Sequence, residues 1–389
     1  MGYGQEVQAE IEKEVNIPYS SRLPISYEEW ERKASTVLAK GVFDYIAGGA
    51  GAEYTIQANR EAFYFCRILP KVMVDVDERN LSVNLFGLKL PSPILLAPAD
   101  RQELYNPEAE LASARAAASL GVPFILSTFS TRSIEQVASV MGFSPRWFQL
   151  YMGKDPDVVL SMVRRAEESG YTAIVLTVDR PKHGWREREL RDLYPPVILN
   201  RAVANFFTDP VFLAKLPKPP QEDPQGAIDM VSKIIHNPSL TWKDLSFLLK
   251  YTRIPILVKG ILNPDDAQMA LDHGADGVIV SNHGGRHLDG AMAALDALPK
   301  VVDLVQGRAP ILMDSGIRRG ADVIKACALG ASAVLVGRPY IYGLAVAGEL
   351  GVRRVIRNLI ADTDITMANS GRRSITEVDR SLVVHISSL

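Results

Sequence analysis

The 389-residue sequence predicts an α/β fold: a closed (β/α)8 barrel of the TIM type, with an N-terminal helical extension and a long loop after the fourth strand. From about residue 92, short apolar runs alternate with helical stretches, which is typical of a parallel sheet with crossover helices. Eight runs are enough to close a barrel, and an open doubly wound sheet with extra strands is the alternative. The runs span residues 94–97, 123–127, 147–151, 173–178, 256–259, 278–281, 311–314 and 333–337.

The N-terminal part is predicted to be helical. Ser26 and Glu29 have the spacing of a capping box, apolar residues follow at helical spacing, and Gly41 is expected to stop the helix. We therefore expect residues 1–70 to form a helical extension that packs on the barrel. Residues 71–389 should form the barrel, and the whole chain should make one catalytic domain.

A long interruption at residues 184–241 separates the predicted fourth and fifth strands. It contains Tyr-Pro-Pro at 194–196 and a proline-rich segment at 216–220. Because long loops inside a compact domain usually have a function, we expect an active-site lid or a mobile loop here.

The composition favours a small-molecule substrate. The 43 basic residues nearly balance 45 acidic ones, so the formal charge of -2 predicts neither nucleic acid nor a membrane as a partner. Cys66 and Cys327 are too few for a disulfide framework, and no Cys/His spacing predicts a metal site. Without a signal peptide or a membrane-length apolar run, we expect a cytoplasmic protein. The C-terminal Ser-Ser-Leu is similar to a peroxisomal signal but lacks its lysine.

Polar or glycine residues stand at the C-terminal end of six predicted strands. In a single strand, a loop charge or a helix cap explains such a residue equally well. In a parallel barrel these ends form one face, so agreement across six strands predicts an active site there. The residues are Gln149 and Tyr151, Thr177 and Asp179, Lys259, residues 281–286, residues 314–318, and Gly337 with Arg338.

The ends of the last two strands indicate anion binding. Residues 314–318 and the pair Gly337 and Arg338 combine small residues with arginines. Small residues let backbone N–H groups approach a ligand, and barrels often bind a phosphate at this place. The simpler interpretation is that these glycines serve turn geometry alone.

An imidazole and a guanidinium, those of His283 and Arg286, stand three residues apart after the sixth strand. A histidine can accept and release a proton near neutral pH, although a lone histidine is more often structural. With Arg286 beside it and Asp179 at the end of another strand, the pattern predicts a base, its charge partner and a cation that binds a carboxylate.

These residues resemble those of the FMN-dependent L-2-hydroxy-acid oxidases and dehydrogenases, a family that includes glycolate oxidase, lactate oxidase and lactate 2-monooxygenase. The resemblance covers about residues 25–385. Its motifs lie at 43–45, 148–151, 176–179, 257–260, 281–284, 314–318 and 337–339. The stretches 184–186, 208–212 and 314–316 resemble the lactate 2-monooxygenase branch more than the plant glycolate oxidases.

The resemblance implies a role for each polar residue near the substrate. His283 would be the base that takes the hydroxyl proton, Asp179 would stabilise the imidazolium, and Tyr151 would contact the hydroxyl or keto oxygen. The substrate-binding residues would be Tyr45, Arg186 and Arg286 at the carboxylate and Phe129 at the side chain. Phe129 stands where glycolate oxidases have tryptophan.

The resemblance also implies that the barrel binds FMN. Lys259 would lie near flavin N1 and O2, where its charge stabilises the reduced ring. The other residues expected to contact the cofactor are Pro98, Ala99, Asp100, Ser127, Gln149, Thr177, Ser281, Asp314, Ser315, Gly316, Arg318, Gly337 and Arg338.

Asp100 departs from the family pattern, which has alanine or glycine facing the flavin at this position. Three states of its carboxylate are open. It could be ionised and face the ring, it could be a neutral acid with a raised pKa, or it could turn away to pair with an arginine such as Arg101.

The function that the resemblance implies is oxidation of a lactate-like L-2-hydroxy acid to the 2-keto acid. The α-hydrogen would pass to flavin N5, and O2 would reoxidise the flavin and give H2O2. Oxidative decarboxylation of the lactate 2-monooxygenase type is one alternative. A non-catalytic flavin-binding protein, disabled by Asp100, is an alternative of another class. The family also implies a homotetramer or a larger homo-oligomer.

Overall fold

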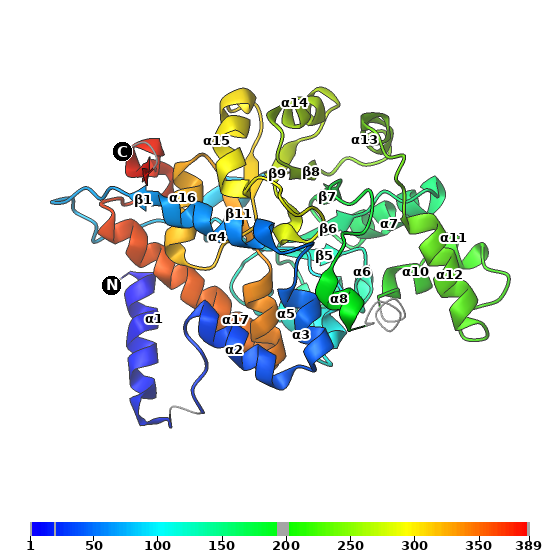
Figure 1. The fold of residues 1–389 in the computed structure, drawn as a ribbon, viewed down its shortest axis with the longest axis horizontal. Helices are drawn as coiled ribbons and strands as arrows, with labels where there is room; N and C mark the ends of the chain where they lie inside the picture. Colours follow the sequence, from blue (N-terminus) through cyan, green and yellow to red (C-terminus); the bar gives the residue numbers. More distant parts are fainter. Residues whose placement is uncertain (1, 19–20, 193–201, 387–389) are drawn as a thin grey trace.

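The computed structural model describes residues 2–18, 21–192 and 202–386 (Figure 1). All eight predicted runs are strands, and they close a barrel in the order β10-β11-β4-β5-β6-β7-β8-β9. The closed barrel is therefore confirmed, and the open sheet is wrong. The strands are β4 (Ile94–Leu96), β5 (Phe124–Ser127), β6 (Arg146–Leu150), β7 (Ile174–Thr177), β8 (Ile256–Ile261), β9 (Gly277–Val280), β10 (Ile311–Met313) and β11 (Ala333–Val336).

The barrel interior consists of an apolar floor below a mostly polar mouth. Successive residues of a strand point to opposite faces, so residues two apart point the same way. The floor is an apolar cluster that includes Leu95, Ile125, Trp147, Val175, Leu257, Ile279, Leu312 and Leu335. Two positions further toward the C-terminal end stand Ala97, Ser127, Gln149, Thr177, Lys259, Ser281, Asp314 and Gly337. The period of two thus carries most of the predicted polar residues to one mouth.

A β-hairpin closes the opposite end of the barrel. It consists of β2 (Val83–Leu85) and β3 (Leu88–Leu90), which pair in antiparallel fashion. Leu85 and Leu90 belong to the same apolar cluster as the barrel floor, and the rings of Phe86 and Trp147 lie 5.8 Å apart. Ligands therefore enter from the C-terminal side.

Crossover helices surround the barrel and bury the outward-facing strand residues in a second, larger apolar core. They are α5 (Ala109–Ala118), α6 (Ile134–Met141), α7 (Pro156–Glu168), α14 (Pro264–Asp272), α15 (Ala294–Val305), α16 (Gly320–Ala328) and α17 (Arg338–Asn369). Short 3-10 helices are η1 (Lys13–Asn16), η3 (Gln102–Leu104), η4 (His283–Gly285), η5 (Ile375–Glu377) and η6 (Arg380–Leu382). Among the described residues, no helix is long and apolar enough to cross a membrane.

The N-terminal residues form α1 (Tyr3–Glu12), α2 (Tyr27–Val37), α3 (Lys40–Ala47) and α4 (Tyr54–Phe65). The predicted capping box of Ser26 and Glu29 is present at the start of α2. The predicted stop at Gly41 is wrong, because Leu38 already adopts an extended backbone and Gly41 lies in the first turn of α3. Helices α1 and α2 pack on α17, and β1 (Cys66–Ile68) pairs with β12 (Val383–His385) near the other end of the chain (Figure 1).

The long interruption between β7 and β8 contains helices in its described parts. They are α8 (Glu187–Arg191), α10 (Ala204–Phe207), α11 (Pro210–Ala214) and α12 (Pro224–Ile235), and α13 (Trp242–Leu248) then leads into β8. Helix α8 packs against α3, whereas α10 to α13 lie to one side of the barrel (Figure 1). Residues 194–196 lie outside the described residues, and a lid function remains a prediction.

A tight kink in α17 fixes the position of its first turn, which carries Arg338 toward the barrel mouth. The backbone leaves the helical conformation at Ala347 and Gly348. On either side of the kink, Gly343 and Gly351 approach so closely that a Cβ on Gly351 would lie 2.0 Å from the Gly343 carbonyl oxygen.

We expect Gly351→Ala to lower the free energy of unfolding by about 1–3 kcal/mol, because the added methyl group forces two backbone segments apart. Thermal unfolding of the holoprotein measures the change. Leu350→Ala is the matched control, since Leu350 is 60% exposed on the same helix. Equal unfolding midpoints for the two variants would contradict the close contact.

Candidate active site

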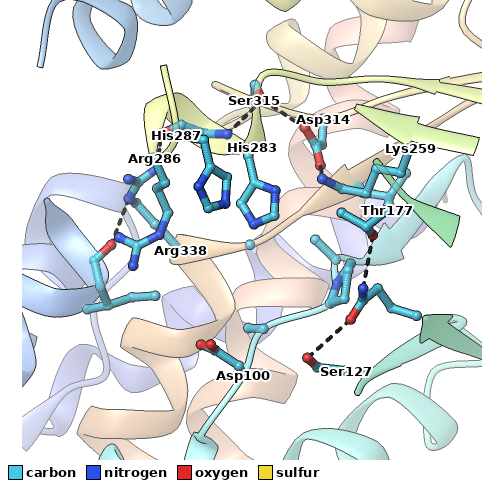
Figure 2. A pocket seen from close by; sticks show the side chains of 18 of the residues that line it. Asp100, Ser127, Thr177, Lys259, His283, Arg286, His287, Asp314, Ser315 and Arg338 are labelled. Carbon is cyan, nitrogen blue, oxygen red and sulfur yellow. Dashed lines mark hydrogen bonds and ion pairs between the residues drawn. The ribbon is translucent and has the colours of Figure 1, made fainter. Parts of the chain in front are cut away.

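The C-terminal mouth of the barrel opens into a cavity (Figure 2). Most of the predicted site residues line it: Tyr45, Pro98, Ala99, Asp100, Ser127, Gln149, Tyr151, Thr177, Arg186, Lys259, His283, Arg286, Asp314, Ser315, Gly316, Arg318, Gly337 and Arg338. The other three, Asp179, Ser281 and Phe129, contact residues of the cavity wall. Asp179 bonds to His283, Ser281 accepts a hydrogen bond from Lys259, and the Phe129 ring packs 5.7 Å from the Tyr151 ring.

His283 and Asp179 meet although they follow different strands. Nδ1 of His283 lies 2.7 Å from Oδ1 of Asp179. The backbone of His283 has a φ of 57°, and its N–H donates to Ser281 Oγ at 3.0 Å, which holds the loop in this left-handed turn. A Cβ on Gly260 would lie 2.5 Å from Asp179 Cβ, so glycine is required in β8 for Asp179 to reach the histidine.

The environment keeps the His283 imidazole neutral. Burial lowers the pKa of His283 well below its usual range, and the charges of Lys259 and Arg186 act in the same direction. Burial also raises the pKa of Asp179. A neutral imidazole is the form that can accept a proton, and the carboxylate beside it orients the ring and stabilises the imidazolium once formed.

The two arginines predicted to bind a carboxylate are both paired with Glu189 of α8. Glu189 Oε1 lies 2.9 Å from Arg186 Nη1 and 3.3 Å from Arg286 Nη2. Burial alone would raise the pKa of Glu189, but His183 and the two arginines outweigh it and lower the pKa to about 2. A substrate carboxylate must therefore share these guanidiniums with Glu189 or displace it.

Asp100 pairs with Arg101 and also accepts a hydrogen bond from the Tyr45 hydroxyl, at 2.8 Å. Burial would raise the pKa of Asp100, but Arg101 and Arg286 outweigh it and hold the pKa below its usual range. The pairing with Arg101 is confirmed, and these cations favour the ionised form of the carboxylate. The carboxylate nevertheless lines the cavity, across from His283 (Figure 2).

Lys259 is a buried cation at the centre of the mouth. Its Nζ donates to Ser281 Oγ at 2.9 Å and lies 3.2 Å from Asp314 Oδ2. Burial would lower the pKa of Lys259, but Asp314 and Asp179 outweigh it and raise the pKa, so the ammonium group stays charged. On β6, the side-chain amide of Gln149 donates to the Thr177 hydroxyl at 3.0 Å and accepts from the Ser127 hydroxyl at 3.3 Å. These two hydrogen bonds hold the Gln149 amide at the barrel mouth.

Arg318 and Arg338 form the predicted anion-binding corner. Arg338 donates to three backbone carbonyls, at 2.9 to 3.0 Å, and no carboxylate pairs with either arginine among the described residues. Burial, together with Arg286, lowers the pKa of Arg338 to about 10. Nε of Arg318 is buried without a partner in the described structure. Two uncompensated cations beside Gly316 and Gly337 fit a phosphate.

Sequence reasoning missed several residues at the cavity: Arg180, His183 and His287 line it, and Glu189 pairs with two of its arginines. The ring of His287 lies 4.3 Å from that of His283, and the spacing of four residues was the available signal. Asp179, His283 and His287 place possible ligand atoms within 4.8 Å of one another, which no Cys/His motif indicated. The direct bond between Asp179 and His283 is the arrangement expected of an oriented base.

Comparison with known proteins supports this description. A model of the family of FMN-dependent dehydrogenases matches residues 34–385. The chain is 44% identical over 360 residues to the L-lactate oxidase of Lysinibacillus sphaericus, covering 92% of each chain. It is 42% identical over 355 residues to the glycolate oxidase of Spinacia oleracea, covering 91% of this chain and 94% of the relative. A soluble mutant of the (S)-mandelate dehydrogenase from Pseudomonas putida superimposes with a TM-score of 0.83 at 38% identity, covering 93% and 99%.

Arg318 and Arg338, which pair with no carboxylate among the described residues, fit a ligand that carries a phosphate, so fold and site together indicate a barrel enzyme that binds a phosphate-bearing cofactor. The family match makes this specific: the chain belongs to the FMN-dependent dehydrogenase family. Its cofactor is FMN, and it oxidises an α-hydroxy acid. The predicted family, cofactor and reaction class are confirmed.

The low pKa of His283 has a consequence for the pH profile. We expect kcat/KM for flavin reduction to stay constant as the pH falls from about 8 through the ordinary histidine value of about 6.5, and to decline only at lower pH. The sign follows because a lowered pKa keeps the base neutral to lower pH. Anaerobic stopped-flow mixing measures the profile. A decline centred at or above pH 6.5 would contradict a neutral His283.

The position of Glu189 generates a second prediction. Glu189→Gln should tighten the binding of a simple carboxylate such as acetate, because Arg186 and Arg286 lose their internal partner. It should also lower the free energy of unfolding by about 3–5 kcal/mol, since two buried cations are left without compensation. Calorimetric titration and thermal unfolding of the holoprotein measure the two effects.

Glu187→Gln is the matched control, because Glu187 is exposed on the same helix and does not line the cavity. It should change neither quantity. If Glu189→Gln lowers stability and leaves acetate affinity unchanged, Glu189 does not compete with the substrate carboxylate.

Proposed function

We propose that the protein oxidises a lactate-like L-2-hydroxy acid to the corresponding 2-keto acid and delivers the electrons to O2, which forms H2O2. The observation that carries this proposal is a neutral, oriented base, His283, in one cavity with the guanidiniums of Arg186 and Arg286. A 2-hydroxy acid presents a hydroxyl group and a carboxylate on neighbouring carbons, and these groups match the base and the cations. The identity with L-lactate oxidase and glycolate oxidase supports a small aliphatic substrate.

The chain's own residues supply the proton transfer and the orientation. His283 accepts the hydroxyl proton as the α-hydrogen leaves the same carbon, and Asp179 stabilises the resulting imidazolium. Arg286 and Arg186 bind the carboxylate and fix the substrate's orientation. Tyr151 donates to the carbinol oxygen, and burial raises the pKa of Tyr151, so its hydroxyl stays protonated as a donor.

FMN, when bound, accepts the α-hydrogen with its electron pair. The structure offers residues that would hold it. Arg318 and Arg338 would bind the phosphate, and Lys259 would place a fixed positive charge beside the ring. The further residues proposed to contact it are Pro98, Ala99, Asp100, Ser127, Gln149, Thr177, Ser281, Asp314, Ser315, Gly316 and Gly337.

Oxidative decarboxylation is the second candidate function. The similarity of residues 184–186 and 208–212 to the lactate 2-monooxygenase branch favours it. In this reaction the keto acid stays bound and reacts with the peroxide formed beside it. Product stoichiometry separates the two reactions, because an oxidase releases one keto acid and one peroxide, whereas a monooxygenase releases the shortened acid and carbon dioxide.

Two further expectations belong to this proposal. The family resemblance supports a homotetramer or larger assembly, which light scattering of the purified holoprotein tests. The cytoplasmic location expected from the sequence stays a prediction. A non-catalytic flavin-binding protein is disfavoured, because Asp100 is accommodated by Tyr45 and Arg101 and the base His283 keeps its bond to Asp179.

The central prediction is that anaerobic mixing with L-lactate bleaches the flavin absorbance, and that His283→Asn slows this reduction by about a hundredfold or more. FMN should stay bound, since the substitution leaves the anion-binding corner of Arg318 and Arg338 unchanged. His385→Asn, an exposed histidine on β12, is the control and should reduce at the parent rate.

Reduction of the His283→Asn flavin at the parent rate would show that another group is the base. A panel of glycolate, L-lactate, longer aliphatic and aromatic 2-hydroxy acids completes the test. If none of them bleaches the parent flavin, the proposed function is wrong.

A further inference from the structure

Asp100 is an anionic side chain within a cavity that binds an anionic substrate. Its side chain is 29% exposed, and it lines the same cavity as His283 and Arg286. Such a placement costs free energy unless the carboxylate is paired, and Arg101 and Tyr45 supply that pairing. The three side chains form a unit, which we call the Asp100 cluster.

The Asp100 cluster uses the one proton of the Tyr45 hydroxyl. That hydroxyl donates to Asp100 at 2.8 Å and accepts from Arg101 Nη1, also at 2.8 Å. Burial raises the pKa of Tyr45 to about 12, so the hydroxyl keeps its proton. The Tyr45 hydroxyl therefore donates its proton to Asp100 in this structure and has no second proton to donate to a substrate carboxylate.

The Asp100 carboxylate keeps free acceptor capacity. A carboxylate offers about four lone-pair positions. Oδ2 accepts from both Arg101 and Tyr45, whereas among the described residues Oδ1 accepts only the longer Tyr45 contact, at 3.0 Å. A ligand in the cavity thus meets an ionised oxygen that still lacks a good donor.

The geometry of the substrate carbon determines which ligand group would meet this oxygen, and this step rests on the proposed function. The tetrahedral α-carbon directs its hydrogen toward the cofactor, its hydroxyl toward His283 and its carboxylate toward Arg286. Its fourth substituent, the side chain, must face the remaining wall. Asp100 lines the cavity across from His283, so a substituent that points away from the base would face it (Figure 2).

The charge balance of the cavity limits the substrate to one carboxylate. Among the described residues, seven cationic side chains line it: Arg101, Arg180, Arg186, Lys259, Arg286, Arg318 and Arg338. Four described carboxylates, those of Asp100, Asp179, Glu189 and Asp314, line the cavity or pair with these cations. The remaining three positive charges match a phosphate with about two negative charges and one substrate carboxylate. A second carboxylate would meet Asp100 and be repelled.

We infer that Asp100 is a specificity residue that selects 2-hydroxy monocarboxylic acids bearing a hydrogen-bond donor, a hydroxyl or an ammonium group, on the carbon next to the carbinol. The donor completes the coordination of Oδ1. The methyl group of lactate would shield the Asp100 carboxylate from water but donate no hydrogen bond to it. We therefore expect lactate to be turned over less efficiently.

Binding of inert acids tests Asp100 apart from the reaction. Propanoate, 3-hydroxypropanoate and 3-aminopropanoate lack the 2-hydroxyl group and differ only at the carbon in question. Calorimetric titration of the holoenzyme should show at least one of the two substituted acids binding about 10-fold tighter than propanoate. Asp100→Ala should abolish this preference, and Asp100→Asn should keep it for the hydroxyl but not for the ammonium.

Glu103→Gln is the control, because Glu103 lies three residues away and outside the cavity, and it should keep every ratio. Retained FMN absorbance and the unfolding midpoint establish that each variant is folded. Equal affinity ratios in the parent, Asp100→Ala and Asp100→Asn proteins would overturn the inference, as would a parent that prefers propanoate.

Turnover separates this inference from the proposed function. The parent should show a kcat/KM for L-glycerate about 10-fold above that for L-lactate, and Asp100→Ala should reverse the order. If lactate is oxidised but the ratio of kcat/KM for L-glycerate to that for L-lactate is the same in the parent and in Asp100→Ala, the inference is wrong and the proposed function is still supported. Binding ratios that respond to Asp100, without flavin reduction by any 2-hydroxy acid, would support the specificity role and defeat the proposed reaction.

Discussion

Closure of the eight-stranded sheet is the constraint on which the site depends. In a closed barrel, inward-facing side chains come from every strand and meet at one mouth, so Gln149, Thr177, Lys259 and Asp314 converge although they lie far apart in the chain. The apolar floor beneath them excludes water from below, and the β2–β3 hairpin closes that end. Charges at the mouth therefore act in a partly desolvated space, where they interact more strongly than in water.

The site is electrostatically incomplete without ligands. Arg318 and Arg338 pair with no carboxylate in the described structure, and burial works against the charge of Arg338. Such an arrangement is costly in the free protein and becomes favourable when a phosphate binds. Glu189, by contrast, compensates the charges of Arg186 and Arg286, the two cations proposed to bind the substrate carboxylate. The cavity therefore keeps an excess of positive charge among the described residues, although Glu189 pairs with two of its arginines.

The barrel and its additions contribute different parts of the site. Strand ends supply the proposed base, the carboxylate that contacts it and the groups proposed to bind the cofactor. The N-terminal helix α3 supplies Tyr45, and the interruption after β7 supplies Arg186 and Glu189. Arg186, one of the two arginines proposed to bind the substrate, therefore comes from a segment outside the repeating barrel, as do Glu189 and Tyr45, which contact charged side chains of the cavity. This division lets substrate preference change through loops and extensions while the barrel chemistry stays the same.

The sequence by itself predicted the eight strands and the polar residues at their ends, because period-two patterning and strand-end chemistry are local signals. It also predicted the pairing of His283 with Asp179, because a closed barrel brings the strand ends together. The phosphate-binding role of residues 314–318, Gly337 and Arg338 stays a prediction. The sequence did not determine the end of α2, where the backbone turns at Leu38 rather than at Gly41. Only the tertiary structure placed Glu189 between two arginines and joined Tyr45 to Asp100 and Arg101. These contacts join segments up to about a hundred residues apart, and a side chain's partner and ionisation depend on which other charges and how much water surround it. No local pattern in the chain encodes that environment.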